Sequence, residues 1–251
     1  MKEGYYKVKT RDNVFEMSVV KYGSTYSIQF GDPRSRAGAC AELSYDTRKP
    51  KDLQLENLAY YPRCAYEHDL KQGDGTRDMI CSVLKLCIDV FPEIKNVYLK
   101  DVSYFDCEED DRMKVYLSYY DLLLYGQTWY ERHFKAIAVD REDRQQLDKF
   151  RELLGSKPRK NVFPFYKGEK FNTWHEYFLE KKRHGCMFFC ENLPAFKHAA
   201  QIDLVYKEFK IRARDIREYY PKNEYEIRRS KNQSGGFSYG RGFQHLTEED
   251  A

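Results

Sequence analysis

The sequence predicts an α+β fold, in which a mixed, mostly antiparallel sheet has flanking helices and is followed by a mainly helical C-terminal extension. Three observations lead to this prediction. The first sixty residues are rich in strand-forming runs, residues 79–91 have the period of an amphipathic helix, and residues 140–155 repeat that period. We expect a first domain over residues 1–140, a helical extension over 141–220 and a polar, glycine-rich tail over 221–251, either flexible or ordered by a partner.

The strands of the first domain are predicted from short β-rich runs. The stretch "NVFEMSVVKYGSTYSIQF" contains two such runs around Gly23 and Ser24, which is the spacing of a tight hairpin. "ACAELSYD" and "LQLENLAYY" continue the pattern. Together these runs predict an antiparallel meander.

A strand–helix–strand unit follows the meander. "CAYEHDL" (residues 64–70) is predicted as a strand, and "NVYLKD" (96–101) as another. Between them, an apolar stripe with helical spacing ends at Pro92; it consists of Met79, Ile80, Val83, Leu84, Cys87 and Phe91. The default for such a unit is a parallel pair of strands with a right-handed crossover.

Two glycines, Gly73 and Gly75, stand at the turn that leads into this helix. The first turn of a helix has unpaired N–H groups and a positive dipole end, and glycine allows close approach of a ligand, so a pyrophosphate fits here. The alternative is a turn glycine and a helix-entry glycine, with Asp74 or Thr76 as the cap. The motif by itself leaves both interpretations open.

A second motif lies in "YGQTWYERHFKAIAV". Thr128 and Glu131 have the spacing of a capping box, so a short helix should begin there, and "KAIAV" should form a strand. Within this helix, Tyr130 stands four residues before Phe134.

The arrangement resembles the GCN5-related N-acetyltransferase superfamily, and within it the divergent acetyltransferase-like proteins of large DNA viruses. That family binds the acyl-CoA pyrophosphate on a Q/R-x-x-G-x-G/A loop before its third helix, and it has a Y-x-x-x-G-F segment after its fifth strand. Gly73 and Gly75 match the first motif and Tyr130 and Phe134 match the second, with Leu70 at the Q/R position and His133 in place of the glycine. The resemblance implies acetyl-CoA as cofactor, held by Gln72, Gly73, Asp74, Gly75, Thr76 and Arg77.

The resemblance also suggests catalytic residues. It implies Tyr130 as the general acid toward the CoA thiolate, although a packed aromatic residue is the alternative. Glu67 and His68 are candidate bases, of which only one can face a cleft if both lie on a strand. Cys107, beside four acidic residues, is a poor nucleophile because its thiolate is disfavoured. The family's usual two helices between its first and second strands are not predicted here, so substrate specificity cannot be transferred.

The C-terminal extension is predicted as helices. Residues 140–155 should form one helix that starts near Asp140 or Asp143, and "TWHE" (173–176) should start a second helix that ends at Gly185. "CMFFC" is predicted as a short buried strand, and a long helix with Asn192 as N-cap should follow, up to residue 220.

Composition limits the functional classes. The balance of 43 Lys and Arg against 40 Asp and Glu is too even to argue for a nucleic-acid binder on charge alone. The sequence has no apolar window long enough for a membrane span and does not start like a signal peptide, so we expect a soluble, cytoplasmic chain. Seven scattered cysteines without a C-x-x-C pair predict reduced thiols and no metal site.

Partners are predicted from the aromatic content of 16% and from the tail. Aromatic side chains and the segment "SGGFSYGRGF" could contact other proteins, with single-stranded nucleic acid as the weaker alternative. Two hypotheses therefore remain. The chain is an acyl-CoA-dependent N-acyltransferase acting on an unidentified small-molecule or peptide amine, or it is a catalytically inactive binding or structural protein, such as a viral assembly or virion component.

Overall fold

The computed structural model describes residues 3–10, 12–31, 39–66, 68–71, 73–101, 103–107, 110–159, 166, 168, 170–182, 185–201, 203, 207–219 and 226–229. The chain forms two compact units, each of which is described by itself. Unit 1 comprises Met1–Tyr98 and Arg212–Ala251, and unit 2 comprises Leu99–Ile211. This division differs from the predicted boundaries at residues 140 and 220, because the chain leaves unit 1 within one strand and returns to it within another.

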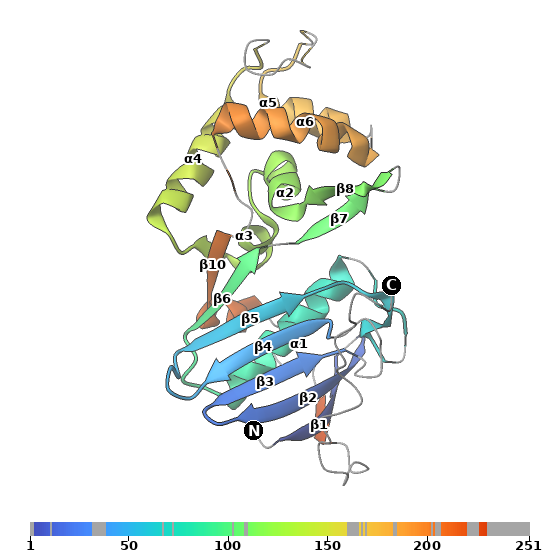
Figure 1. The fold of residues 1–251 in the computed structure, drawn as a ribbon, viewed down its shortest axis with the longest axis vertical. Helices are drawn as coiled ribbons and strands as arrows, with labels where there is room; N and C mark the ends of the chain where they lie inside the picture. The colour runs from blue at the N-terminus through green and yellow to red at the C-terminus, as the bar shows by residue number, and fades with distance from the viewer. Residues whose placement is uncertain are drawn as a thin grey trace, which may run out of the picture. The chain divides into compact units, whose positions relative to one another are not determined.

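The fold is α+β with a mixed, mostly antiparallel sheet, as predicted (Figure 1). In unit 1 the predicted meander is formed by β1 (Gly4–Lys9), β2 (Val14–Tyr22), β3 (Thr25–Phe30), β4 (Ala41–Asp46) and β5 (Asp52–Leu58), each antiparallel to the next. The predicted hairpin turn is present at Gly23 and Ser24. Tyr22 pairs with Thr25 across it, and Gly23 has a φ of +58°, which favours glycine.

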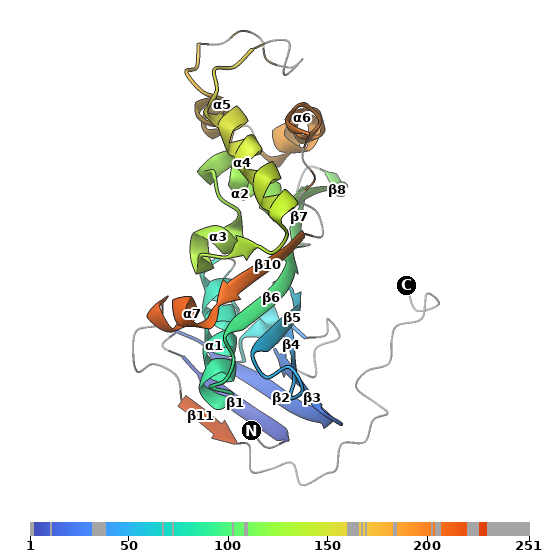
Figure 2. The same cartoon turned by 90° about the vertical axis from the view of Figure 1, so that its left-hand side faces the viewer.

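A row of aliphatic side chains crosses the sheet from β2 to β5. Val19 pairs with Ile28, Ile28 with Leu43 and Leu43 with Leu55, and all four are buried. Helix α1 (Asp74–Val90) covers one face of these strands (Figures 1 and 2). The predicted apolar stripe of this helix is buried, so burial of apolar area on both elements stabilises unit 1.

Helix α1 connects two neighbouring strands that run in the same direction. The amides of Lys95 and Asn96 donate to the carbonyl oxygen of Lys51 at 2.8 and 3.0 Å, so β6 (Asn96–Asp101) starts beside the start of β5. The predicted parallel pair is therefore present, but its first strand is β5 and not residues 64–70.

Two C-terminal elements also belong to unit 1. Helix α7 (Ala213–Tyr219) packs against α1 (Figure 2), and β11 (Glu226–Arg229) pairs antiparallel with β1 at the edge of the sheet. Part of the predicted tail is thus a strand. Residues 221–225 and 230–251 lie outside the described part of the chain.

The described residues of unit 2 form a hairpin, five helices and two short sheet strands. Its elements are β7 (Tyr104–Cys107), β8 (Asp110–Tyr116), α2 (Leu117–Tyr125), α3 (Trp129–Phe134), β9 (Ile137–Ala138), α4 (Arg141–Gly155), α5 (Trp174–Lys181), α6 (Gly185–Ala200) and β10 (Lys207–Arg212). The starts of α3, α4 and α5 agree with the predictions. Thr128, Asp140 and Thr173 each accept a backbone N–H as side-chain N-caps.

The predicted strand "CMFFC" and the predicted N-cap at Asn192 are wrong, because both lie inside α6. The apolar residues Phe189, Leu193 and Phe196 recur at i, i+4 and i+7 and are buried, so the helical period extends through this run. Gly185 begins this helix and does not end the one before it, since α5 already ends at Lys181.

The long helix predicted up to residue 220 is interrupted by β10. Phe209 and Ile211 alternate with more exposed neighbours, and Phe209 pairs with Ala138 of β9. Pairing with a strand thus overrides the helical propensity of this segment.

Candidate functional site

Gly73 is the N-cap of α1 and is exposed. Its φ of +82° lies in the region that favours glycine, and a Cβ built there would have nothing within 4 Å. The backbone at this position is therefore open to the approach of another molecule at the positive end of a helix of 17 residues.

Gly75 is present for a different reason. It is buried, and a Cβ there would lie 2.8 Å from Cδ1 of Leu70. Its amide donates to the carbonyl oxygen of Lys71 at 3.0 Å, so this N–H is used inside the turn. The second glycine is explained by packing against Leu70, which is the helix-entry alternative.

The other residues predicted to hold the cofactor flank these glycines. Asp74 is exposed, Thr76 and Arg77 are half-buried, and Gln72 lies outside the described residues. The amide of Arg77 donates to the carbonyl oxygen of Gly73 at 2.9 Å, which is the first turn of the helix. Residues 71–77 are called the glycine turn below.

The described residues of 64–70, which were predicted to form the strand with the candidate bases, are not in a strand. The start of this segment is instead a 3-10 turn, η1 (Pro62–Cys64), and the amide of Leu70 donates to the carbonyl oxygen of Pro62 at 2.6 Å, which folds the segment back on itself. His68 is exposed in a bend, and Glu67 lies outside the described residues. The alternation argument for these two residues therefore does not apply.

Tyr130 lies in α3, within unit 2, and is only 3% exposed. Its ring packs against Trp129, with centroids 5.0 Å apart, and against Phe134. The hydroxyl is hydrogen-bonded to Ser103. Burial, and then the charge of Asp101, raises the pKa of the Tyr130 hydroxyl, so it stays protonated at neutral pH.

Asp101, the last residue of β6, belongs to the same polar group. Its Oδ1 accepts the amide of Ser103 at 3.2 Å, and the residue is 1% exposed. Burial raises the pKa of Asp101 to about 6, although the hydrogen bonds from Ser103 lower it. Its charge also raises the pKa of Tyr130.

Asp121 on α2 adds a second buried carboxylate. Its Oδ1 lies 3.2 Å from Nη2 of Arg132, yet burial still raises the pKa of Asp121 to about 6. Within the described part of the chain, Oδ2 of Asp101, Oδ2 of Asp121 and Nε of Arg132 are buried without a hydrogen-bond partner. We call Asp101, Ser103, Asp121, Tyr130 and Arg132 the Tyr130 cluster. Shifted carboxyl groups and unpaired buried polar atoms are typical of functional sites.

The sequence did not indicate Asp101, Asp121 or Arg132. They come from a strand and two helices, and only their convergence makes them a group. The one available signal was that Asp101 ends a predicted strand that is otherwise apolar at alternate positions.

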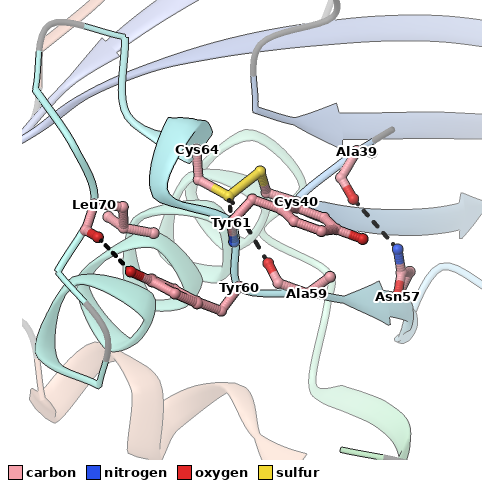
Figure 3. The surroundings of a disulfide bond; sticks show 8 residues. All are labelled: Ala39, Cys40, Asn57, Ala59, Tyr60, Tyr61, Cys64 and Leu70. Carbon is pink, nitrogen blue, oxygen red and sulfur yellow. Dashed lines mark hydrogen bonds between the residues drawn. A yellow bond between two sulfur atoms is a disulfide. The ribbon is translucent and has the colours of Figure 1, made fainter. Parts of the chain in front are cut away.

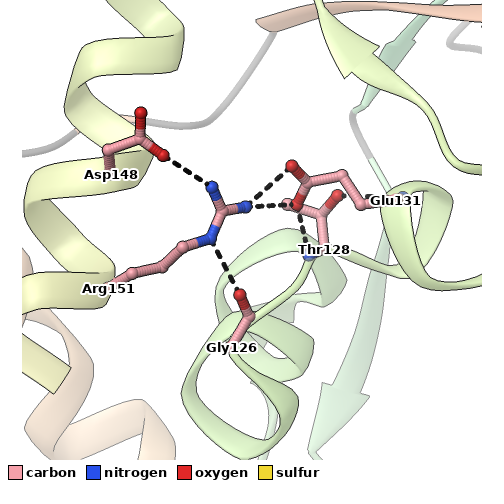
Figure 4. A network of polar contacts seen from close by, with 5 residues as sticks. All are labelled: Gly126, Thr128, Glu131, Asp148 and Arg151. Carbon is pink, nitrogen blue, oxygen red and sulfur yellow. Dashed lines mark hydrogen bonds and ion pairs between the residues drawn. The ribbon is translucent and has the colours of Figure 1, made fainter. Parts of the chain in front are cut away.

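An ion-pair network fixes the start of α3 (Figure 4). Nη2 of Arg151 donates to both carboxylate oxygens of Glu131 at 2.7 and 2.8 Å, and its Nε donates to the carbonyl oxygen of Gly126 at 2.9 Å. Glu131 also accepts the amide of Thr128 at 2.8 Å. A carboxylate held by these contacts orients the helix that carries Tyr130.

Four of the seven cysteines are paired, which corrects the prediction of reduced thiols. Cys40 bonds to Cys64 in unit 1 (Figure 3), and Cys107 bonds to Cys186 in unit 2. Each pair has a Cα–Cα distance below 6 Å, which suits a disulfide. Cys107 is thereby unavailable as a nucleophile. The sequence missed the pairs because 24 and 79 residues separate the partners.

A cavity of about 760 Å³ lies in unit 2 and includes none of the predicted site residues. Lys197 lies 3.8 Å from Asp203 and Lys207 lies 2.9 Å from Asp143, so carboxylates offset much of the lysine charge. The lining is Lys114, Tyr116, Tyr119, Gln146, Cys190, Leu193, Pro194, Lys197, His198, Gln201, Asp203 and Lys207.

Comparisons with known proteins give no family: no family model, curated protein or solved structure matches the chain. Among the described residues, no helix combines the length and the apolar content needed to cross a membrane. The same residues contain no group of three or more His, Cys, Asp or Glu side chains that could hold a metal ion.

Proposed function

We propose that the chain is an acyl-CoA-dependent N-acyltransferase, in which the glycine turn holds the pyrophosphate of acetyl-CoA and the acyl group passes to a small-molecule or peptide amine. The observation that carries the proposal is Gly73. It is an exposed glycine with φ of +82° and open space at its Cβ position, at the start of a long helix between two parallel strands.

The charges of the glycine turn are compatible with an anion. Lys71 is exposed and Arg77 is half-buried on the same turn, and the helix dipole adds positive potential. Asp74 opposes these charges, so binding depends on the backbone and on Lys71 more than on net charge. The amides of Gly75 and Arg77, which donate inside the turn, are not part of the proposed contact.

Acetyl-CoA, when bound, supplies an activated thioester. The chain must then accept a proton from the amine and supply one to the thiolate. His68 is an exposed imidazole close in sequence to the turn and suits the first role, while Glu67 stays a candidate outside the described residues. The resemblance assigns the second role to Tyr130, which keeps its proton at neutral pH; burial and the charge of Asp101 raise its pKa, and this makes the hydroxyl a weaker proton donor than an unshifted tyrosine.

One observation favours the second candidate, a binding or structural protein without catalysis. Tyr130 is 3% exposed, packs against Trp129 and Phe134, and bonds to Ser103. A hydroxyl enclosed in this way stabilises the fold even if it does not contact a substrate. A viral assembly or virion role belongs to this second candidate.

Titration calorimetry with acetyl-CoA tests the proposal. Wild-type protein should bind, and Lys71→Glu should weaken binding by about five- to tenfold because it reverses a charge on the turn. Lys49→Glu is the matched control, since Lys49 is also an exposed lysine of unit 1 but lies in the turn between β4 and β5. It should leave the affinity unchanged.

Two outcomes distinguish the candidates. The absence of both binding heat and thermal shift at about 1 mM acetyl-CoA overturns the acyltransferase proposal. Binding accompanied by release of free thiol with an added amine supports it, whereas equal loss of affinity in both lysine variants would show that the contact is not at the glycine turn.

A further inference from the structure

We infer that the disulfide between Cys40 and Cys64 fixes the shape of the glycine turn, so that a dithiol reductant switches ligand binding there. The inference rests on the proposed function, because it names the regulation of that site. Figure 3 shows the bond among the residues that precede the turn.

One end of the disulfide is anchored in the sheet. Cys40 comes directly before β4, its amide donates to the carbonyl oxygen of Phe30 at 2.7 Å, and its carbonyl oxygen accepts the amide of Ala59 at 2.8 Å. Phe30 ends β3 and Ala59 follows β5, so Cys40 is held between the two strands that flank β4. This end of the bond is a fixed point.

The other end of the disulfide holds the segment that connects β5 to α1. Cys64 ends η1, its amide donates to the carbonyl oxygen of Tyr61 at 3.0 Å, and its sulfur accepts the amide of Tyr61 at 3.3 Å (Figure 3). Among its described residues, this connection has only the short η1 as regular structure, so a tether helps it to keep one conformation.

Leu70 transmits this constraint to the glycine turn. Its amide donates to the carbonyl oxygen of Pro62 at 2.6 Å, and its carbonyl oxygen accepts the hydroxyl of Tyr60 at 3.0 Å (Figure 3). Its side chain fills the space beside Gly75, since a Cβ there would lie 2.8 Å away. Thus η1 positions Leu70, and Leu70 positions the first turn of α1.

The chemistry of the switch is thiol–disulfide exchange. A dithiol reductant supplies two electrons and two protons, the Sγ–Sγ bond breaks, Cys40 and Cys64 become thiols, and the reductant becomes its own disulfide. Both cysteines are buried, so exchange requires local opening of this segment.

The other cysteines of unit 1 do not compete. Burial raises the pKa of the Cys81 and Cys87 thiols to about 12, so at neutral pH they remain protonated and do not attack the bond. The disulfide between Cys40 and Cys64 is therefore broken and formed again without exchange with Cys81 or Cys87.

Hydrogen exchange and calorimetry on the full chain test the inference. After reduction with dithiothreitol, and in the double variant Cys40→Ser/Cys64→Ser, the amides of Leu70 and Gly75 should exchange at least about tenfold faster. The amide of Leu84, in the middle of α1, should keep its rate. Acetyl-CoA should bind about tenfold more weakly in both forms.

The double variant Cys107→Ser/Cys186→Ser is the matched control, because it removes the disulfide of unit 2. It should leave the amide exchange rates of Leu70 and Gly75 and the affinity for acetyl-CoA unchanged.

The remaining outcomes separate the inference from the proposed function. Unchanged exchange at Leu70 and Gly75 after reduction overturns the inference, and so does loss of protection at Leu84, which would mean that the bond holds all of unit 1. Faster exchange with unchanged acetyl-CoA affinity also overturns the switch. Faster exchange without acetyl-CoA binding in either state overturns the proposed function, while the coupling of disulfide and turn is supported.

Discussion

The glycine turn of unit 1 is open at Gly73, whereas the Tyr130 cluster of unit 2 is closed around its polar groups. Gly73 has nothing within 4 Å of its Cβ position, and Asp101 and Tyr130 are 1% and 3% exposed. An open backbone turn can receive a ligand without rearrangement, but a closed cluster must be opened first or else serves the fold alone. Each region therefore needs a different test.

The largest expected effect is on turnover by Tyr130→Phe. If its hydroxyl protonates the thiolate, the variant should lose about 10² to 10⁴ in thiol release while acetyl-CoA affinity stays nearly unchanged. The assay uses acetyl-CoA with polyamines, aminoglycosides and lysine peptides as acceptors.

Tyr125→Phe is the control for this variant, because Tyr125 is an exposed tyrosine of the same unit. Wild-type turnover in Tyr130→Phe would remove the residue from the mechanism and leave the cluster as a structural feature.

A double-mutant cycle on Leu70 and Gly75 should have the next largest effect. Leu70→Ala should cost about 2–5 kcal/mol of unfolding free energy, since the side chain is buried against the turn. Gly75→Ala should cost about 1–3 kcal/mol in the wild type because the new Cβ meets Leu70 Cδ1. In the Leu70→Ala background the same change should be neutral, or stabilising by up to about 1 kcal/mol through helix propensity.

Urea unfolding of the four proteins measures this cycle. If the free-energy changes of the two single variants add up to that of the double variant, the prediction is contradicted. Additivity would show that the cost of a Cβ at residue 75 does not come from contact with Leu70.

The third effect is a dependence of stability on pH. The pKa of Asp101 is about 6 in the folded chain and 3.8 in a model compound, so ionisation is penalised by folding. Stability should fall as pH rises from about 4 to about 6, by about 3 kcal/mol from this group. Asp101→Asn should remove that fall, and should make the protein more stable than wild type at pH 8.

Asp46→Asn provides a control of opposite sign. Hydrogen bonds from Arg48 lower the pKa of Asp46, so its contribution is present at neutral pH and is lost on acidification. Denaturation curves at pH 2, 4, 6 and 8 for all three proteins test both expectations, because the Asp46 contribution is lost only below about pH 4. An unchanged pH profile in Asp101→Asn would refute the burial argument.

Local signals allowed the sequence to predict the meander, α1 and the starts of α3 and α5. The hairpin at Gly23, the capping box at Thr128 and the N-cap at Thr173 depend on residues within a few positions of one another, so local sequence is enough to predict them. An apolar run such as "CMFFC" is ambiguous in the same local window, because helix and strand can both bury it.

The errors around the candidate sites come from contacts between distant residues. The disulfide to Cys40 and the bond from Leu70 to Pro62 replace the predicted strand over residues 64–70. The Tyr130 cluster joins Asp101, Asp121 and Arg132 from three elements. The spacing of glycines and of tyrosine and phenylalanine predicts where the backbone turns, but it does not predict which side chains become buried.

The smallest expected effect concerns the two T-W-x-E segments, which begin α3 and α5. Thr128 is fully buried, and its Oγ1 accepts the amide of Glu131, whose carboxylate also binds Arg151. At the second segment the Oγ1 of Thr173 accepts the amide of Glu176. Here Thr173 is half-buried and Glu176 is exposed, whereas Thr128 is fully buried.

Thr128→Ala should therefore cost about 1–2 kcal/mol and Thr173→Ala about 0.5–1 kcal/mol. Thr128→Ser keeps the hydroxyl acceptor and should recover most of the loss, as measured by urea unfolding. Because α3 carries Tyr130, Thr128→Ala should also speed amide exchange at Tyr130, whereas Thr173→Ala should not. An equal loss of unfolding free energy in the two alanine variants would contradict this prediction. It would show that burial and the ion pair with Arg151 do not strengthen the cap at Thr128, and that the packing around Tyr130 does not depend on this cap.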